Sequence, residues 1–123
     1  MTNSTGLFLY VRDVAASVRF YGDLFDIQPV QASLAFAMLV LPSGVPLGLW
    51  STDDVKPAVE GDGGGHEIGF KVDDAAAVDQ HCAEWWGKGA KIALPPTDLG
   101  FGRSFVALDP DNHRLRVYAP IAR

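Results

Sequence analysis

Apolar and polar positions alternate over residues 7–11, a period-two pattern of β-favouring residues that predicts a strand. From Val14 to Phe25 the apolar residues recur instead at helical spacing. Asp13, just before this stretch, has a side chain suited to capping a helix, and the segment 26–29 ends the helical pattern. The chain is therefore predicted to start with a strand followed by a helix.

Three further strands are predicted in the first half of the chain. Residues 36–41 and 47–50 flank the turn sequence Pro42-Ser43-Gly44, which is typical of a hairpin. A short edge strand is expected near residues 30–33. The first half thus has the plan strand, helix, three strands.

The second half repeats this plan. The strand-then-Asp unit of residues 7–13 recurs at residues 68–74, and Leu47-Gly48-Leu49-Trp50 is echoed by residues 115–118. A helix is expected to begin at Asp74, and a last hairpin joins residues 105–108 to residues 114–118. Trp85 and Trp86, near the helix C-terminus, are both predicted to pack against the sheet. Two copies of one small module predict a two-fold cup lined by equivalent positions.

The length of 123 residues fits one domain made of two half-domains that share a core. We expect a single domain over residues 1–123, with module one at about 5–52 and module two at about 66–120. Residues 53–65, rich in Gly, Asp and Pro, are predicted to form a mobile linker rather than a phosphate-binding loop, because they precede a strand.

Composition excludes several classes of function. A net charge of -5 without a basic stripe argues against nucleic acid as a partner. No apolar run approaches the roughly 20 residues of a membrane span. The single cysteine, Cys82, cannot form an internal disulfide, which agrees with a reducing compartment. A cytoplasmic protein is expected.

Two motifs resemble those of a known superfamily. The pattern Asp-x-x-x-Ser-x-x-Phe-Tyr at residues 13–21 follows a strand, and Asp109-Pro110-Asp111-Asn112 precedes the final strand. Together they resemble the vicinal oxygen chelate superfamily, which includes glyoxalase I, extradiol dioxygenases, fosfomycin-resistance enzymes and bleomycin-resistance proteins. The resemblance covers residues 6–120. It implies an α+β fold of two tandem βαβββ modules, which form an open, curved mixed sheet around a cleft and commonly pair as a homodimer.

The resemblance also implies where a metal would be held. Metal-dependent members place ligands on the first and last strands of each module, at positions that correspond here to Gly6, Gly48, Glu67 and Arg116. Glycine offers no side-chain ligand, and arginine is a cationic donor. Only Glu67 could coordinate a divalent ion, so three of four positions depart from the enzyme pattern. We therefore expect no metal and no cofactor.

Histidines do not obviously replace the missing ligands. A shift of one residue would bring His66 into the cleft, but it would turn Ile68 and Phe70 out of the core. No spacing links His81 or His113 to this position, and both are expected to be ordinary, partly exposed histidines.

Strand alternation predicts instead a cup for a small molecule. The expected lining and ligand-binding residues are Phe8, Tyr10, Phe36, Met38, Gly48, Trp50, Glu67, Phe101, Arg116 and Tyr118. Gly6 and Gly48 are expected to leave room for a guest, and Glu67 and Arg116 to form a buried ion pair. Residues 98–103 either close over the guest or simply connect two strands.

The first functional hypothesis is metal-independent sequestration of an apolar or aromatic compound such as an antibiotic, as the resemblance to bleomycin-resistance proteins implies. The alternative is a metal-dependent lyase, isomerase or dioxygenase of the same superfamily. A third hypothesis is a metal-free enzyme with Glu67 as its catalytic base, which requires an environment that favours the protonated carboxyl group.

Overall fold

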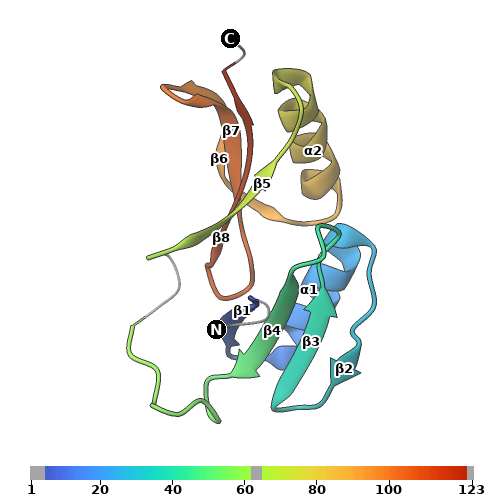
Figure 1. Cartoon of the computed structure of the whole chain (residues 1–123), viewed down its shortest axis with the longest axis vertical. Helices are drawn as coiled ribbons and strands as arrows, with labels where there is room; N and C mark the ends of the chain where they lie inside the picture. The colour runs from blue at the N-terminus through green and yellow to red at the C-terminus, as the bar shows by residue number, and fades with distance from the viewer. Residues whose placement is uncertain (1–4, 62–64, 122–123) are drawn as a thin grey trace. The chain divides into compact units, whose positions relative to one another are not determined.

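The computed structural model describes residues 5–61 and 65–121 of the chain. The chain divides into two compact units, residues 1–61 and 62–123. Each unit contains one helix and one open, four-stranded mixed sheet in the order strand, helix, three strands (Figure 1). The predicted α+β fold of two βαβββ modules is confirmed, with a separate sheet for each module.

Unit 1 consists of β1 (Leu7–Val11), α1 (Val14–Phe25), β2 (Gln31–Ala32), β3 (Phe36–Val40) and β4 (Pro46–Ser51). The strand order is β1-β4-β3-β2. β1 runs parallel to β4, and β3 is antiparallel to both β4 and β2. The register places Phe8 opposite Gly48, and Phe36 opposite Trp50.

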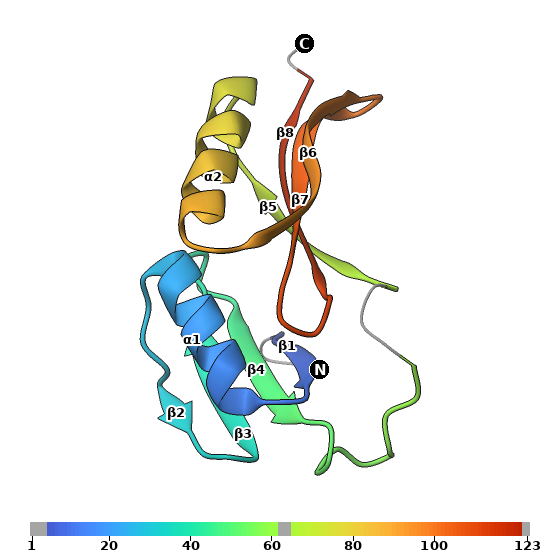
Figure 2. The same ribbon diagram turned by 180° about the vertical axis from the view of Figure 1, so that it is seen from behind.

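The helix of unit 1 begins and ends where the sequence predicts. The Asp13 side chain accepts a hydrogen bond from the Ala16 backbone N–H at 3.1 Å, which satisfies one of the free amides of the first turn. Asp26 adopts the left-handed conformation (φ 55°) and ends the helix. The buried side of α1 packs on β3 and β4 (Figures 1 and 2).

Unit 2 consists of β5 (Glu67–Lys71), α2 (Ala75–Gly87), β6 (Lys91–Leu99), β7 (Gly102–Leu108) and β8 (Arg114–Pro120). Its strand order, β5-β8-β7-β6, repeats that of unit 1. β5 is parallel to β8, and the remaining pairs are antiparallel. The register places Gly69 opposite Arg116, and Ser104 opposite Tyr118.

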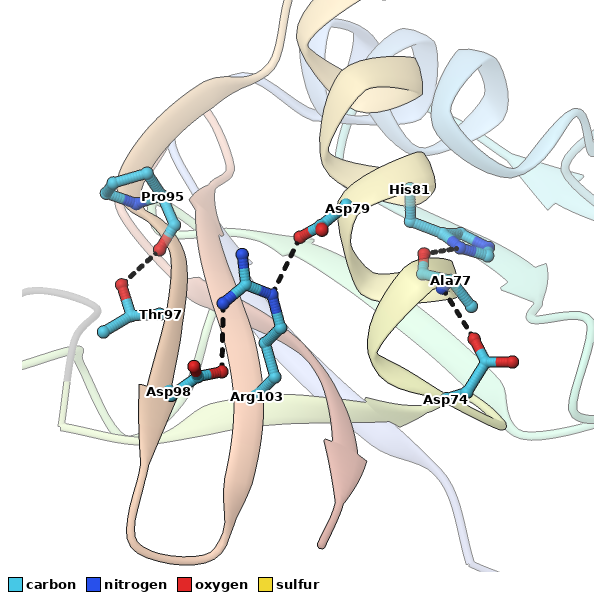
Figure 3. Close-up of polar contacts among 8 residues, drawn as sticks. All are labelled: Asp74, Ala77, Asp79, His81, Pro95, Thr97, Asp98 and Arg103. Atoms are coloured by element: carbon cyan, nitrogen blue, oxygen red, sulfur yellow. Dashed lines mark hydrogen bonds and ion pairs between the residues drawn. The ribbon is translucent and has the colours of Figure 1, made fainter. Parts of the chain in front are cut away.

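The helix of unit 2 corrects one prediction. Asp74 caps α2 by accepting from the Ala77 N–H at 2.8 Å (Figure 3). Trp85 is 2% exposed and packs edge-on against Phe70 and Phe105, at ring-centroid distances of 5.9 and 5.4 Å. Trp86, however, is 69% exposed, so its predicted packing on the sheet is wrong. Adjacent helical residues point about 100° apart, and only one of the two can face the sheet.

Strand β6, for which no residue range was predicted, contains Pro95-Pro96, which cannot donate to a sheet ladder. As an edge strand it tolerates them, because only one of its sides is paired. The ladder with β7 has register shifts between Ile92 and Leu94 and between Leu94 and Thr97. The Thr97 hydroxyl donates to the Pro95 carbonyl at 2.6 Å within this irregular part (Figure 3).

The segment predicted as a linker starts inside unit 1. Val55 is 5% exposed, and its backbone N–H donates to the Ser51 carbonyl at 3.2 Å. The start of the segment is therefore a turn that closes the core of unit 1. Residues 62–64, the glycine-rich part, lie outside the described residues.

Neither α1 nor α2, the helices of the described ranges, has the length and apolar character needed to span a membrane.

Candidate functional site

The sheet of unit 1 has an aromatic face that no described segment of the unit covers fully. Leu47 and Leu49 point toward α1 and are fully buried, whereas Phe8 and Tyr10 on the opposite face are 56% and 42% exposed. This division confirms the predicted alternation. We call the second face the open face of unit 1; its members are Phe8, Tyr10, Phe36, Met38, Gly48 and Trp50.

Three aromatic rings meet on the open face of unit 1. The centroid of Phe8 lies 6.2 Å from that of Phe36 and 6.4 Å from that of Trp50, and the Phe36 and Trp50 centroids are 6.3 Å apart. The Phe36 and Trp50 rings are nearly perpendicular, at 89°. Tilted and edge-on arrangements of this kind are the favoured ones for aromatic groups. The rings support one another and still expose apolar surface.

Gly48 does not leave the space that the sequence suggested. It is buried, and a Cβ atom built on it would lie 2.6 Å from Cδ1 of Phe8 and 3.1 Å from Cε1 of Phe36. The Phe8 ring already occupies the volume above this residue. Gly48 therefore serves as the base on which Phe8 rests, which corrects the prediction of an open space there.

The equivalent face of unit 2 is polar. The Arg116 guanidinium donates from Nε to Oε1 of Glu67 at 2.6 Å and from Nη2 to Oε2 at 3.3 Å. Its Nη1 donates to the hydroxyl of buried Ser104 at 2.9 Å. The predicted pair of Glu67 with Arg116 is thus present as a two-pronged ion pair. It is not buried, because the side chains of Arg116 and Glu67 keep 18% and 35% of their surface exposed.

Tyr118 and Phe101 supply aromatic surface beside this ion pair. Their ring centroids are 6.2 Å apart, at an interplanar angle of 73°. The Tyr118 ring lies over Gly69, where a Cβ atom would be 3.2 Å from Tyr118 Cε1. Gly69 is directly opposite Arg116 in the ladder, so the ring and the guanidinium belong to neighbouring positions of one face.

The residues at the superfamily's ligand positions do not fit a divalent metal. Gly6 and Gly48 have no donor, and both Glu67 carboxylate oxygens accept from Arg116. Arg116 has no lone pair to offer and would repel a cation. Across residues 5–61 and 65–121 there is no group of three or more His, Cys, Asp or Glu side chains arranged to hold a metal ion.

The register at His66 agrees with the prediction. Phe70 packs on Trp85 of α2, so Glu67 and Lys71 belong to the opposite face. A shifted register would bury Lys71, which is exposed. His66 itself precedes β5 and is exposed.

Residues 98–103 form a hairpin connection. Asp98 and Leu99 end β6, Gly102 begins β7, and only Gly100 and Phe101 lie between the strands. The Arg103 guanidinium bonds to Asp79 of α2 and to Asp98, each at 2.9 Å (Figure 3). These hydrogen bonds, first that to Asp79 and then that to Asp98, raise the pKa of Arg103. The hairpin is thus tied to the helix, which favours the simple connection over a closing loop.

His113 is more constrained than the sequence suggested. Its Nδ1 lies 2.7 Å from Oδ2 of Asp109, whose side chain is fully buried, while Oδ1 of Asp109 accepts from the backbone N–H groups of Asp111 and His113. Burial lowers the pKa of His113, but its hydrogen bond and charge interaction with Asp109, together with the charge of Asp111, outweigh this and raise it. The spacing of Asp109 and His113 around a predicted turn was the available signal for this pair.

His81 bonds within its helix, to the Ala77 carbonyl at 2.8 Å (Figure 3). Burial, with a smaller contribution from Asp79, raises the pKa of the Cys82 thiol, which disfavours the reactive thiolate. Ser104 was missed from the sequence. Its hydroxyl becomes a partner of Arg116 only through the pairing of β7 with β8, and the neighbouring position in the alternation was the only signal.

Comparison with known proteins gives consistent matches. The family model of the Glyoxalase/Bleomycin resistance protein/Dioxygenase superfamily matches residues 4–117. The phenazine antibiotic resistance protein EhpR of Enterobacter agglomerans is 30% identical over an alignment of 113 residues, and the match covers 89% of this chain and 85% of that protein.

Solved structures agree. Protein ATC0852 of Agrobacterium tumefaciens is 41% identical, with a TM-score of 0.85 over 99% of this chain and 100% of that one. A glyoxalase-related enzyme of Fulvimarina pelagi is 23% identical, with a TM-score of 0.80 over 98% of this chain and 94% of that one. A lactoylglutathione lyase of Agrobacterium tumefaciens is 18% identical, with a TM-score of 0.75 over 96% and 94% of the two chains. The last two likenesses concern the fold alone.

Proposed function

This chain belongs to the Glyoxalase/Bleomycin resistance protein/Dioxygenase superfamily, and from this premise we propose that it binds a planar apolar or aromatic small molecule without metal and without changing it. Such binding would sequester the compound, as in antibiotic resistance. Phe8 carries the proposal: this large apolar side chain is 56% exposed on a sheet face shared with two other aromatic rings.

An exposed group of rings of this kind is costly to leave in water and well suited to a flat guest. Phe8, Phe36 and Trp50 each present ring surface, and stacking of a guest on such surface is favourable beyond the area that it buries. Phe101 and Tyr118 offer a second, smaller aromatic surface in unit 2.

The relative named for resistance to phenazine antibiotics supports this class of ligand. Phenazine is a planar tricyclic aromatic compound, which matches the chemistry of the open face of unit 1. At 30% identity over most of both chains, the likeness favours a related role and leaves the individual compound to experiment.

Metal independence is supported by the donor set. Of the four ligand positions of the superfamily, two are glycines, one is a cation, and the one carboxylate is engaged by that cation. The enzyme hypotheses depend on Glu67, whose oxygens both accept from Arg116. No described contact favours these hypotheses over simple binding.

The test compares two tryptophans. Calorimetric titration with phenazine should show binding to the wild type, a loss of affinity of about tenfold or more in Trp50→Ala, and no change in Trp86→Ala. Trp86, 69% exposed on α2, is the matched control because it loses the same ring away from the open face. Equal affinities of the wild type and Trp50→Ala would place the binding surface elsewhere.

A thermal-shift panel on chelator-treated protein tests metal independence. A ligand at 100 times its dissociation constant stabilises by about 2.7 kcal/mol, which raises the melting midpoint by several degrees. We expect such a shift with planar aromatic compounds and none with divalent metals. A clear shift with one metal would contradict the proposal and direct the next experiments to an enzyme assay.

We also propose that the protein acts as a homodimer, as many relatives of this superfamily are understood to do. Light scattering coupled to size exclusion would show a mass of about twice the 13.2 kDa of one chain.

A further inference from the structure

The open face of unit 2 carries an excess of positive charge in a chain whose net charge is -5. We use this name for the sheet face of unit 2 that bears Glu67 and Arg116. The ladder places Lys71, Lys91 and Arg114 on the same face as Arg116, through successive paired positions. Glu67 is the single carboxylate among the paired positions of that face, so the face attracts anions although the protein as a whole is acidic.

Arg116 is held in place and retains donor capacity. Two of its N–H groups bond to Glu67 and one bonds to Ser104. A guanidinium has five N–H donors, so two remain for a further acceptor. Its partners also fix the side chain before any ligand arrives, which lowers the entropic cost of binding.

Aromatic surface lies beside these donors. Tyr118, two residues along β8 from Arg116, covers Gly69 and contacts the Phe101 ring. Because Gly69 has no side chain, nothing at that position separates the Tyr118 ring from the Arg116 position directly opposite. Ring surface and a guanidinium at adjacent positions together suit an aromatic group that bears an acceptor.

We propose that the open face of unit 2 selects aromatic compounds that carry an ionised carboxylate, which accepts hydrogen bonds from the remaining N–H groups of Arg116. This inference rests on the proposed function and adds the charge of the compound to it. The carboxylate is favoured over a neutral acceptor because Lys71, Lys91 and Arg114 leave the face positive after Glu67 has neutralised one cation.

The test uses pairs of compounds in which a methyl ester replaces the carboxylate and so removes its charge. Affinities are measured by calorimetry for phenazine-1-carboxylate and its methyl ester, and for 2-naphthoate and its methyl ester, at neutral pH and low salt. We expect each carboxylate to bind about tenfold or more tightly than its ester, and this preference to shrink as salt screens the charges.

Two variants of the ion pair should change the affinity for carboxylates in opposite directions. Arg116→Gln removes the donor and should weaken carboxylate binding by about tenfold or more. Glu67→Gln removes the competing anion and should strengthen it severalfold. Ester affinity should change less than carboxylate affinity in both variants, because the ester carries no charge for the site to attract. Arg19→Gln, which removes the same charge from the exposed side of α1, is the matched control and should change neither affinity.

The outcomes separate the inference from the proposed function. Tight binding of both esters and carboxylates without preference would retain the proposed function and overturn the charge selection. A similar loss of carboxylate affinity in Arg116→Gln and Glu67→Gln would show that the ion pair is only structural, and would also overturn it. Failure of all four compounds to bind would overturn the proposed function together with the inference.

Discussion

The turns that join the last two strands of each unit have the same backbone conformation but different side chains. In unit 1 the Leu41 N–H donates to the Val45 carbonyl at 2.9 Å; in unit 2 the Asp109 N–H donates to the His113 carbonyl at 3.0 Å. The residue before the last carries a positive φ in both, 92° at Gly44 and 66° at Asn112. Unit 1 has the apolar residues Leu41 and Val45 at the two positions where unit 2 has the ionisable residues Asp109 and His113.

The open faces show a similar exchange. In unit 1 the first strand carries the large Phe8 and the last strand carries Gly48 opposite it; in unit 2 the first strand carries Gly69 and the last strand the large Arg116. Trp50 and Tyr118 occupy equivalent positions, two residues beyond Gly48 and Arg116. One face has become an aromatic surface and the other a cationic one.

The edge strands differ as well. β2 has 2 residues and β6 has 9, and β6 continues into a tight hairpin with β7. Helix packing and ladder hydrogen bonds keep the backbones of the two units alike. Side chains that point away from the helix are not under this constraint, so they differ between the two units.

The largest effect should come from the β6–β7 hairpin of unit 2, whose edge strand is much longer than β2. Gly102 has a φ of 150°, and a Cβ atom there would overlap the carbonyl oxygen of Ala119. Because that obstacle is backbone, Gly102→Ala should lower the free energy of unfolding by about 3 kcal/mol or more. Gly100→Ala, where a Cβ meets nothing within 4 Å, is the control and should change stability little. Denaturant unfolding measures both, and equal stabilities would mean that β7 is not held against β8 at this point.

Substitution of the glycine that each open face carries should have an intermediate effect on the free energy of unfolding. Gly48→Ala would force the Phe8 ring to move, because the new Cβ would lie 2.6 Å from it, and should destabilise by about 1 kcal/mol. In Gly69→Ala the nearest atom, Cε1 of Tyr118, is 3.2 Å away, so a small shift suffices and stability should stay within about 0.5 kcal/mol of the wild type.

A double-mutant cycle tests the contact between the Phe8 ring and Gly48. Phe8→Ala combined with Gly48→Ala should show a favourable interaction energy in urea denaturation, because the first change removes the ring that the second one strikes. Additive effects of the two substitutions would show that the ring does not rest on Gly48.

The smallest effect is the pH dependence of stability that the Asp109–His113 turn of unit 2 contributes. The pKa of His113 is raised in the folded protein, so its protonated form stabilises the fold. This contribution is complete below the ordinary histidine pKa of about 6.5 and is lost as the pH rises through the raised value. The melting temperature of the wild type should therefore fall over this range relative to Asp109→Leu/His113→Val, which gives unit 2 the apolar pair of unit 1. If the melting temperatures of the wild type and the double variant change with pH in parallel, the protonated His113 does not stabilise the fold.

Much of the fold follows from short-range patterns. The alternation of residues 7–11, the caps Asp13 and Asp74, and the repeat of both in the second half predicted the order of the elements and the residues of all of them except β6. These features depend on side chains close together in the chain, so the sequence displays them directly. The same alternation placed the predicted strand residues of each open face on that face, whereas Phe101 lies in the β6–β7 connection. The predicted contact of Glu67 with Arg116 is present.

Tertiary structure decided what occupies the space between those residues. Four features depend on which strands are neighbours and on how each side chain is oriented. They are the Phe8 ring above Gly48, the exposure of Trp86, the hydrogen bond of Arg116 to Ser104 and the hydrogen bond of Arg103 to Asp79. Sequence spacing determined the face on which a side chain lies. Only the packed sheet determined whether that position became a cavity, a ring contact or an ion pair, because contacts between residues far apart in the chain arise only when the strands pair.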